Sequence, residues 1–166
     1  MKRRKVPPLL AAVEPPTYVM DTSAWFNVNE SADPVSAWAI LQLLIAAQRL
    51  VVPPEVIEEL KLDDDVWPRL QPLEEQFRLV RSDEEYFKRV GIIAAAFPGM
   101  AKIRSKKTPA DPFVIALAEL EELTVVCDES KKKPSRKIPG VCDKRNVRCI
   151  PLTTMLADER HLLKGT

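Results

Sequence analysis

The segment TYVMD at residues 17–21 is the clearest indication of how this chain folds. It is a short apolar strand that ends at the acid Asp21, a pattern typical of strands buried on both faces of a sheet. Similar strands are predicted at residues 50–52, 123–127 and 147–150. Helices are predicted over residues 34–48, 55–60, 83–97, 112–122 and 152–163. This alternation predicts an α/β fold with a parallel sheet covered on both faces.

The connections are predicted from capping residues, prolines and charge. N-caps are expected at Asp33 and Asp111, each directly before a proline, and at either Ser82 or Asp83. A helix over residues 64–77 and a short strand at 79–80 are also predicted. Two basic loops are expected, over residues 101–107 and 131–140.

Length and composition favour one soluble globular domain. The chain has 166 residues, of which 46% are hydrophobic and 30% charged, which excludes a disordered or fibrous protein. We expect a single domain over residues 17–166, preceded by a flexible, basic, proline-rich arm over residues 1–16. No apolar stretch is long enough for a membrane span or a signal-peptide core, so we expect a cytoplasmic protein without a membrane partner. Three cysteines and one histidine support neither a disulfide framework nor a zinc site.

The net charge of +1 is a cancellation between segments of opposite sign. Residues 1–16 carry a net charge of +3 and residues 131–148 a net charge of +7. The rest of the chain therefore has a net charge of −9. An acidic body with basic segments does not exclude a nucleic-acid ligand, although the total alone would argue against one.

Acidic residues occur where parallel strands end, which is where α/β proteins gather functional groups. Asp21 ends the first strand, and Asp128 and Glu129 follow the third. Glu59 lies in the helix after the second strand, and Asp111 begins a later helix. Carboxylates brought close together repel one another unless a cation intervenes, and oxygen ligands suit Mg²⁺ or Mn²⁺. Singly, each acid except Asp21 also fits an ordinary role as a helix cap, a turn residue or a solvated side chain.

Four motifs together resemble the PIN-domain ribonucleases. They are YVMDTSAW (18–25), VVPPEVIEELK (51–61), ADPFVIALA (110–118) and TVVCDES (124–130). The segment KIPGVCDKRNVRCIPLTTML (137–156) is similar to one PIN-like branch with a C-terminal KIPxVC segment. The resemblance covers about residues 17–156. It implies a three-layer α/β/α sandwich and an acidic pocket that binds Mg²⁺ or Mn²⁺.

The resemblance also implies which residues form this pocket. The family's first three acids correspond to Asp21, Glu59 and Asp111, with Ser23 as the accompanying hydroxyl. The fourth corresponds best to Glu129, with Asp128 as an alternative, and Cys127 stands where the family has threonine. We expect Asp21 and Asp111 to bind metal most directly, and Glu59 and Glu129 to act through water or to position the nucleophile.

The activity implied is hydrolysis of phosphodiester bonds in single-stranded RNA, in the manner of the toxin of a toxin–antitoxin pair. The implied partners are the RNA, an antitoxin protein and a second copy of the chain. Cations beside the acids would offset their repulsion of RNA, and the candidates are Lys102, Arg104, Lys106, Lys107, Lys131, Lys132 and Lys133. The alternative is a catalytically inactive PIN-like module that binds RNA or protein.

Overall fold

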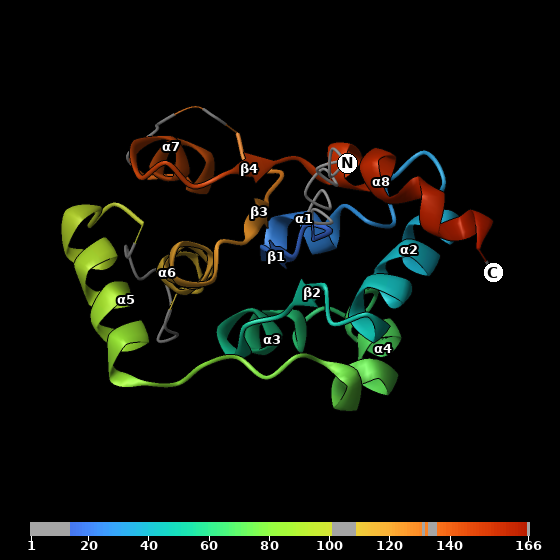
Figure 1. Cartoon of the computed structure of the whole chain (residues 1–166), viewed down its shortest axis with the longest axis horizontal. Coiled ribbons are helices and arrows are strands. Elements are labelled where there is room, and N and C mark those ends of the chain that lie inside the picture. Colours follow the sequence, from blue (N-terminus) through green and yellow to red (C-terminus); the bar gives the residue numbers. More distant parts are fainter. Residues whose placement is uncertain (1–13, 101–108, 131, 133–135, 166) are drawn as a thin grey trace, which may run out of the picture.

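The computed structural model describes residues 14–100, 109–130, 132 and 136–165. Within them lies a parallel sheet with helices on both faces, so the predicted three-layer α/β/α sandwich is confirmed (Figure 1). The strands are β1 (Tyr18–Met20), β2 (Leu50–Val51), β3 (Thr124–Val126) and β4 (Cys149–Ile150), in the spatial order β2-β1-β3-β4.

The strand register brings the carboxyl ends of β1 and β3 to the same edge of the sheet. Val19 pairs with Val51 on one side and with Val125 on the other, and Met20 pairs with Val126. All residues of β1 and β3 are buried, as the continuous apolar pattern predicted. The acids that follow these two strands must therefore lie close together.

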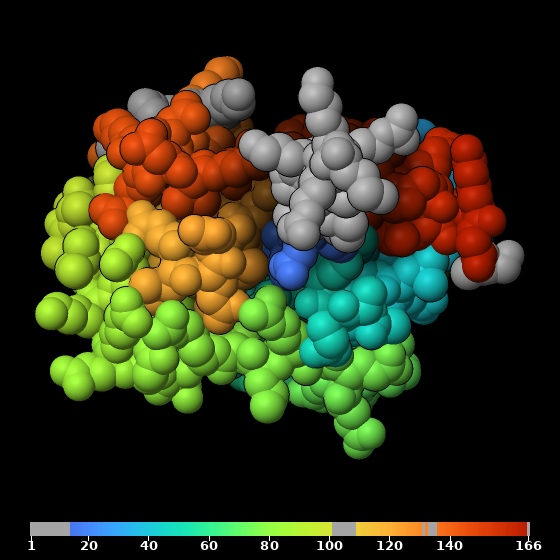
Figure 2. Space-filling view, viewed as in Figure 1, coloured from blue at the N-terminus to red at the C-terminus, as the bar shows by residue number. Residues whose placement is uncertain are grey.

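The helices form two groups on either side of the sheet (Figure 1). One face carries α5 (Glu84–Ala96), α6 (Asp111–Glu121) and α7 (Ile138–Lys144), and the other carries α2 (Pro34–Ala46) and α8 (Leu152–Glu159). Figure 2 shows α5 and α6 packed side by side in the space-filling view. The remaining helical elements are α1 (Thr22–Phe26), α3 (Pro54–Leu60), α4 (Trp67–Leu70), η1 (Gln71–Gln76) and η2 (Arg160–Lys164).

Ion pairs that are wholly or partly buried join elements that are distant in sequence. On one side of the sheet, Glu119 of α6 accepts hydrogen bonds from Arg89 of α5 and from Arg145, which follows α7. Near the amino end of β1, Tyr18 donates a hydrogen bond of 2.7 Å to Glu159, which also binds Arg49. Glu159 is only 2% exposed, so both of its oxygens depend on these protein partners.

Some local predictions are confirmed. Asp33 caps α2 through the amide of Ser36, and Asp83 rather than Ser82 caps α5. The four predicted strands are present, each shorter than predicted. The helix predicted over 64–77 is divided into α4 and the 3₁₀ helix η1, and each of them has a proline in its first turn.

Other local predictions are wrong. Residues 79–80 form no strand, and Leu79 is 93% exposed. The end of the segment 131–140, predicted as loop, already belongs to α7, because Pro139 lies in the first turn of that helix, where proline is tolerated. The N-cap of α6 is Ala110, so Asp111 is the first helical residue and makes no capping hydrogen bond.

Two predictions concern segments that lie wholly or partly outside the described residues. The basic loop over residues 101–107 lies outside the described residues, and so do residues 1–13 of the predicted arm. No helix among the described residues is long and apolar enough to cross a membrane.

Candidate functional site

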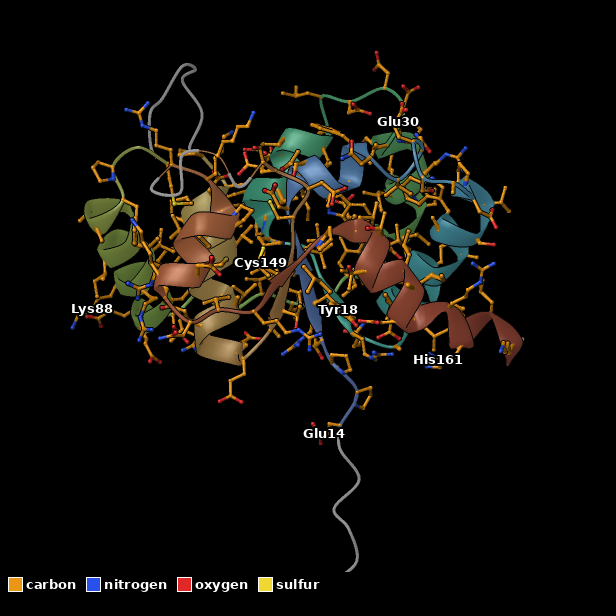
Figure 3. All side chains as sticks on the ribbon, turned by 90° about the horizontal axis from the view of Figure 1, so that it is seen from above. Glu14, Tyr18, Glu30, Lys88, Cys149 and His161 are labelled. Carbon is orange, nitrogen blue, oxygen red and sulfur yellow. The ribbon has the colours of Figure 1, made fainter. Side chains whose placement is uncertain are left out.

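The candidate site lies at the carboxyl edge of the sheet, around the start of α1. Figure 3 shows β1 running from the side of Glu14 toward α1. The backbone amide of Asp21 donates to the carbonyl of Val126 at 2.9 Å, which joins the ends of β1 and β3. Asp21 and the segment Cys127–Glu129 therefore leave the sheet at the same edge.

Asp21 is buried at this edge and is held by Ser23. Its side chain is the N-cap of α1, and one oxygen accepts hydrogen bonds from the Ser23 amide at 3.1 Å and from the Ser23 hydroxyl at 2.7 Å. Burial raises the pKa of Asp21, the Ser23 hydrogen bonds oppose the rise, and the charge of Glu129 adds to it. Asp21 is thus held in one orientation by Ser23, and its ionised form is destabilised by burial.

Asp111 lies close enough to the other predicted acids to be affected by all of them. Its pKa is raised to about 8, first by burial and then by the charges of Asp21, Glu129 and Glu59. Its carboxylate makes no hydrogen bond to the part of the chain that the structure describes, because it is the first residue of α6 and not its cap. The structure thus brings the four acids into one electrostatic neighbourhood, and Asp111 is the most available of them for a ligand.

Glu59 connects three helical elements at the site. Its carboxylate accepts a hydrogen bond from the Thr22 hydroxyl of α1 and a long one, 3.4 Å, from the amide of Ala110 just before α6. Both contacts lie beside other predicted acids, since Thr22 follows Asp21 and Ala110 precedes Asp111. Glu59 therefore faces the site, with its oxygens already bound to protein donors.

Glu129 and Asp128, the two candidates for the fourth acid of the site, have different surroundings. Glu129 accepts hydrogen bonds from Lys137 at 2.9 Å and from the amide of Ile138 at 3.1 Å, and its charge acts on Asp21 and Asp111. Asp128 instead binds Asn27 at 3.0 Å and the amide of Leu152 at 2.8 Å. The geometry favours Glu129 as the fourth acid and gives Asp128 the role of joining α1 to α8.

Ser23 and Cys127 fill the space between Asp21 and the end of β3. The Ser23 hydroxyl also accepts a hydrogen bond from the Asp128 amide at 3.2 Å and lies 3.6 Å from the Cys127 sulfur. A hydrogen bond with Cys149, burial and the charge of Asp21 raise the pKa of the Cys127 thiol. Cys127 is therefore a neutral thiol beside Asp21, not a thiolate ligand.

Most of the predicted cations lie outside the described residues. These are Lys102, Arg104, Lys106, Lys107, Lys131 and Lys133. Lys132 is described and is exposed, and its backbone amide binds the Ser130 hydroxyl. Among the described residues, the cation beside the acids is Lys137. It belongs to the basic segment over residues 131–137 that was predicted to border the acids, although it is not one of the seven individual candidate cations. Its position directly before Ile138-Pro139, at the start of α7, was the available signal, but that helix was predicted as loop.

The donor set fits a hard divalent cation in part. Among the residues that the structure describes, no three His, Cys, Asp or Glu side chains are arranged to hold one metal ion together. Mg²⁺ needs less than this, because it keeps several waters and is usually bound through one or two carboxylates and substrate phosphates. Asp21 and Asp111 are candidate oxygen donors for such an ion, since burial and neighbouring acids raise the pKa of both carboxyl groups.

Comparisons with known proteins give a family and a fold. No curated protein sequence matches the chain. A solved structure titled "Crystal structure of PAE2754 from Pyrobaculum aerophilum" is similar, with a TM-score of 0.51 and 15% identity over 88% of this chain and 98% of that one. At this identity the likeness supports the α/β/α fold alone. One family model, described as a domain of unknown function (DUF4411), matches residues 18–163. The chain therefore belongs to the DUF4411 family.

Proposed function

We propose that this protein is a metal-dependent endoribonuclease that hydrolyses phosphodiester bonds of single-stranded RNA. The observation that carries the proposal is the convergence of four acids at the carboxyl edge of the sheet. Asp21 leaves β1 beside the end of β3, and Glu59 binds both Thr22 and the amide of Ala110. The charges of Asp21, Glu129 and Glu59, together with burial, raise the pKa of Asp111 to about 8. Four acids from separate parts of the chain raise the energy of the metal-free protein when they are ionised together. A divalent cation removes this cost, and a phosphate group is a common substrate of such centres.

Each acid has a distinct part in this proposal. Asp21 and Asp111 would hold the cation directly, and Glu59 and Glu129 would act through water, because their oxygens already accept protein hydrogen bonds. Ser23 keeps the Asp21 carboxylate in one orientation through two hydrogen bonds. When bound, Mg²⁺ or Mn²⁺ would lower the pKa of a water molecule and polarise the phosphoryl oxygen.

The reaction needs a proton acceptor as well as charge neutralisation. In hydrolysis the oxygen of water bonds to phosphorus, one phosphorus–oxygen ester bond breaks, and the leaving oxygen takes up a proton. The carboxylates of Glu59 and Glu129 lie beside Asp21 and Asp111 and suit orientation of the attacking water. The resemblance to PIN-domain ribonucleases supports RNA as the substrate and extends the proposal to a toxin restrained by an antitoxin protein.

One observation favours a second candidate, a catalytically inactive module that binds RNA or protein. Glu129 is bound to Lys137 and to the Ile138 amide, and Glu59 to Thr22. A site whose acids are satisfied by protein donors is stable without metal. Cleavage assays separate the two candidates directly.

The deciding experiment measures RNA cleavage with and without metal. A labelled single-stranded RNA of mixed sequence is incubated with the protein in Mn²⁺, in Mg²⁺ and in EDTA. We expect cleavage only with metal, and a loss of about a hundredfold or more in Asp21→Asn and Asp111→Asn, since metal catalysis supplies several kcal/mol.

The matched control is Asp143→Asn, because Asp143 is an exposed acid of α7 with no predicted role. It should cleave like the wild type. Cleavage in EDTA, or equal cleavage by both site variants, contradicts the proposed mechanism. No cleavage of any RNA tested, with RNA binding retained, favours the inactive module.

A further inference from the structure

Lys137 is held at the candidate site by a single carboxylate that binds both its side chain and the next backbone amide. The ammonium group donates to one oxygen of Glu129 at 2.9 Å, and the amide of Ile138 donates to the other at 3.1 Å. This two-point contact fixes the start of α7 relative to the loop after β3. The ammonium group of Lys137 therefore lies against Glu129, at the border of the candidate site.

The ammonium group of Lys137 also acts on the acids beyond Glu129. Its charge lowers the pKa of Asp111, against the rise caused by burial and the three neighbouring acids. Its side chain is 42% exposed, whereas that of Glu129 is 18% exposed. An ammonium group has three donors, and Glu129 accepts one of them. Lys137 therefore lies beside the site, and its side chain is partly open to solvent.

Helix stability does not account for this lysine. A positive charge at a helix N-terminus opposes the helix macrodipole. The Glu129 carboxylate already binds the first amide of α7, and a half-exposed ion pair contributes little to stability. Binding of an anion explains a cation in this position better than stabilisation of α7 does.

We infer that Lys137 binds a non-bridging oxygen of the RNA phosphate that enters the acidic site. This inference rests on the proposed function and deepens it by naming a substrate contact. Lysine is a point-charge donor suited to phosphate, and an acidic site repels RNA unless a cation offsets its charge. Glu129 holds the ammonium group in place, and the phosphate completes its hydrogen bonds.

The test compares Lys137→Met with Lys137→Arg and with the control Lys88→Met. Lys88 is an exposed lysine on α5, whose position is labelled in Figure 3. Rates of cleavage of a short single-stranded RNA are measured at saturating Mn²⁺, together with the urea midpoint and Mn²⁺ affinity. We expect Lys137→Met to lower kcat/KM by about tenfold to a hundredfold, as loss of one charged hydrogen bond predicts. Lys137→Arg should retain part of the kcat/KM that Lys137→Met loses. Neither variant should have a lower urea midpoint or a lower Mn²⁺ affinity than the wild type.

The salt dependence of RNA affinity gives a readout that a structural role would not change. Fluorescence anisotropy with a labelled RNA is measured in an Asp21→Asn background, in which cleavage is suppressed. Lys137→Met should reduce the slope of log affinity against log salt by about 0.7, the value for one phosphate contact on a single strand, and Lys88→Met should not.

The outcomes separate this inference from the proposed function. Metal-dependent cleavage by the wild type with unchanged kcat/KM in Lys137→Met overturns the inference and leaves the proposed function standing. If the wild type does not cleave RNA, the proposed function fails, and the affinity measurements decide the inference. Equal RNA affinity and salt slope for wild type and Lys137→Met then overturn it.

Discussion

Asp111 combines burial, like-charged neighbours and the lack of a hydrogen-bond donor among the described residues. Its pKa of about 8 lies far above the ordinary value of 3.8, so the metal-free protein holds a proton there that the unfolded chain has already released. The folded state binds more protons than the unfolded state between these two pH values. Stability from this group is complete below pH 4 and is lost as the pH rises to 8. Asp21, whose pKa is also raised, acts in the same direction.

Asp111→Asn should therefore stabilise the metal-free protein at alkaline pH. We expect the variant to exceed the wild type by on the order of 2 kcal/mol at pH 8.5, with a smaller difference at pH 5. Urea unfolding in EDTA at both pH values measures the effect. With Mn²⁺ present the order should reverse, because an ion held by Asp111 stabilises the folded wild type. An equal difference at the two pH values would show that the Asp111 carboxyl group has an ordinary pKa.

At the level of single residues, the sequence predicted which acids meet but not how they are bound. Asp21 and Asp111 could be found because each stands at a distinctive place, after an apolar strand and before a proline. The basic segment that contains Lys137 could be placed beside the site from the sequence, but this lysine could not be distinguished from its neighbours. Its contact depends on Glu129 turning back to the start of α7. Such a contact arises from tertiary packing, which a pattern of residue types does not contain.

Among the secondary-structure elements, α1 and α8 are joined to the end of β3 by Asp128. Its two oxygens accept hydrogen bonds from Asn27, which follows α1, and from the amide of Leu152, the first residue of α8. The N-cap of α8 is Pro151, which makes no side-chain capping hydrogen bond, so Asp128 supplies the missing acceptor from a distant part of the chain. A carboxylate at a helix N-terminus is also favoured by the helix macrodipole.

Asp128→Ala should destabilise the protein without impairing metal binding. We expect a loss of about 1–2 kcal/mol, the usual cost of removing a helix cap. The measurements are the free energy of unfolding in urea and Mn²⁺ affinity by calorimetry. The comparison variant is Glu129→Ala, which should weaken Mn²⁺ binding because its charge acts on Asp21 and Asp111. The opposite pattern would make Asp128 the fourth acid of the site.

Strands and long helices could be predicted because their patterns are local, whereas two short helices could not. The five residues of α1 are too few to establish a helical period, and they are held by the Asp21 cap and by packing of Trp25 in the core. Pro139 and Gly140 favoured a loop where α7 begins. The strand predicted at residues 79–80 is absent. The prediction was based on only two apolar residues, and so short a pattern does not indicate which strand would pair with it.

In the molecule as a whole, a buried polar network near the amino end of β1 joins the two ends of the domain. Glu159 at the end of α8 accepts hydrogen bonds from Tyr18 of β1 and from Arg49, which directly precedes β2. Arg49 also binds the carbonyl of Pro16 at 2.9 Å. Because Glu159 is almost fully buried, loss of its charge leaves the partly buried Arg49 without the carboxylate that pairs with it among the described residues.

Glu159→Gln should therefore be one of the most destabilising single substitutions outside the apolar core. We expect a loss of about 3–5 kcal/mol in the free energy of unfolding, since breaking a buried pair leaves an uncompensated charge. Tyr18→Phe, which removes one hydrogen bond and keeps the pair, should cost about 1 kcal/mol. Thermal and urea unfolding of both variants provides the comparison. If Glu159→Gln and Tyr18→Phe both lose only about 1 kcal/mol, water replaces the carboxylate beside Arg49.

The inner position of β1 has a consequence for how the protein is made. Of the strands that the structure describes, β1 is synthesised before the others, although it lies between β2 and β3 in the sheet. The hydroxyl of its Tyr18 binds Glu159, which lies 141 positions later in the chain. At about 5–20 residues per second, that interval lasts on the order of ten seconds. Throughout it, the apolar TYVM segment lacks its complete set of partners and is exposed to other nascent chains. Chaperones that shield extended apolar segments should therefore improve the yield of this protein more than a change in its surface charge would.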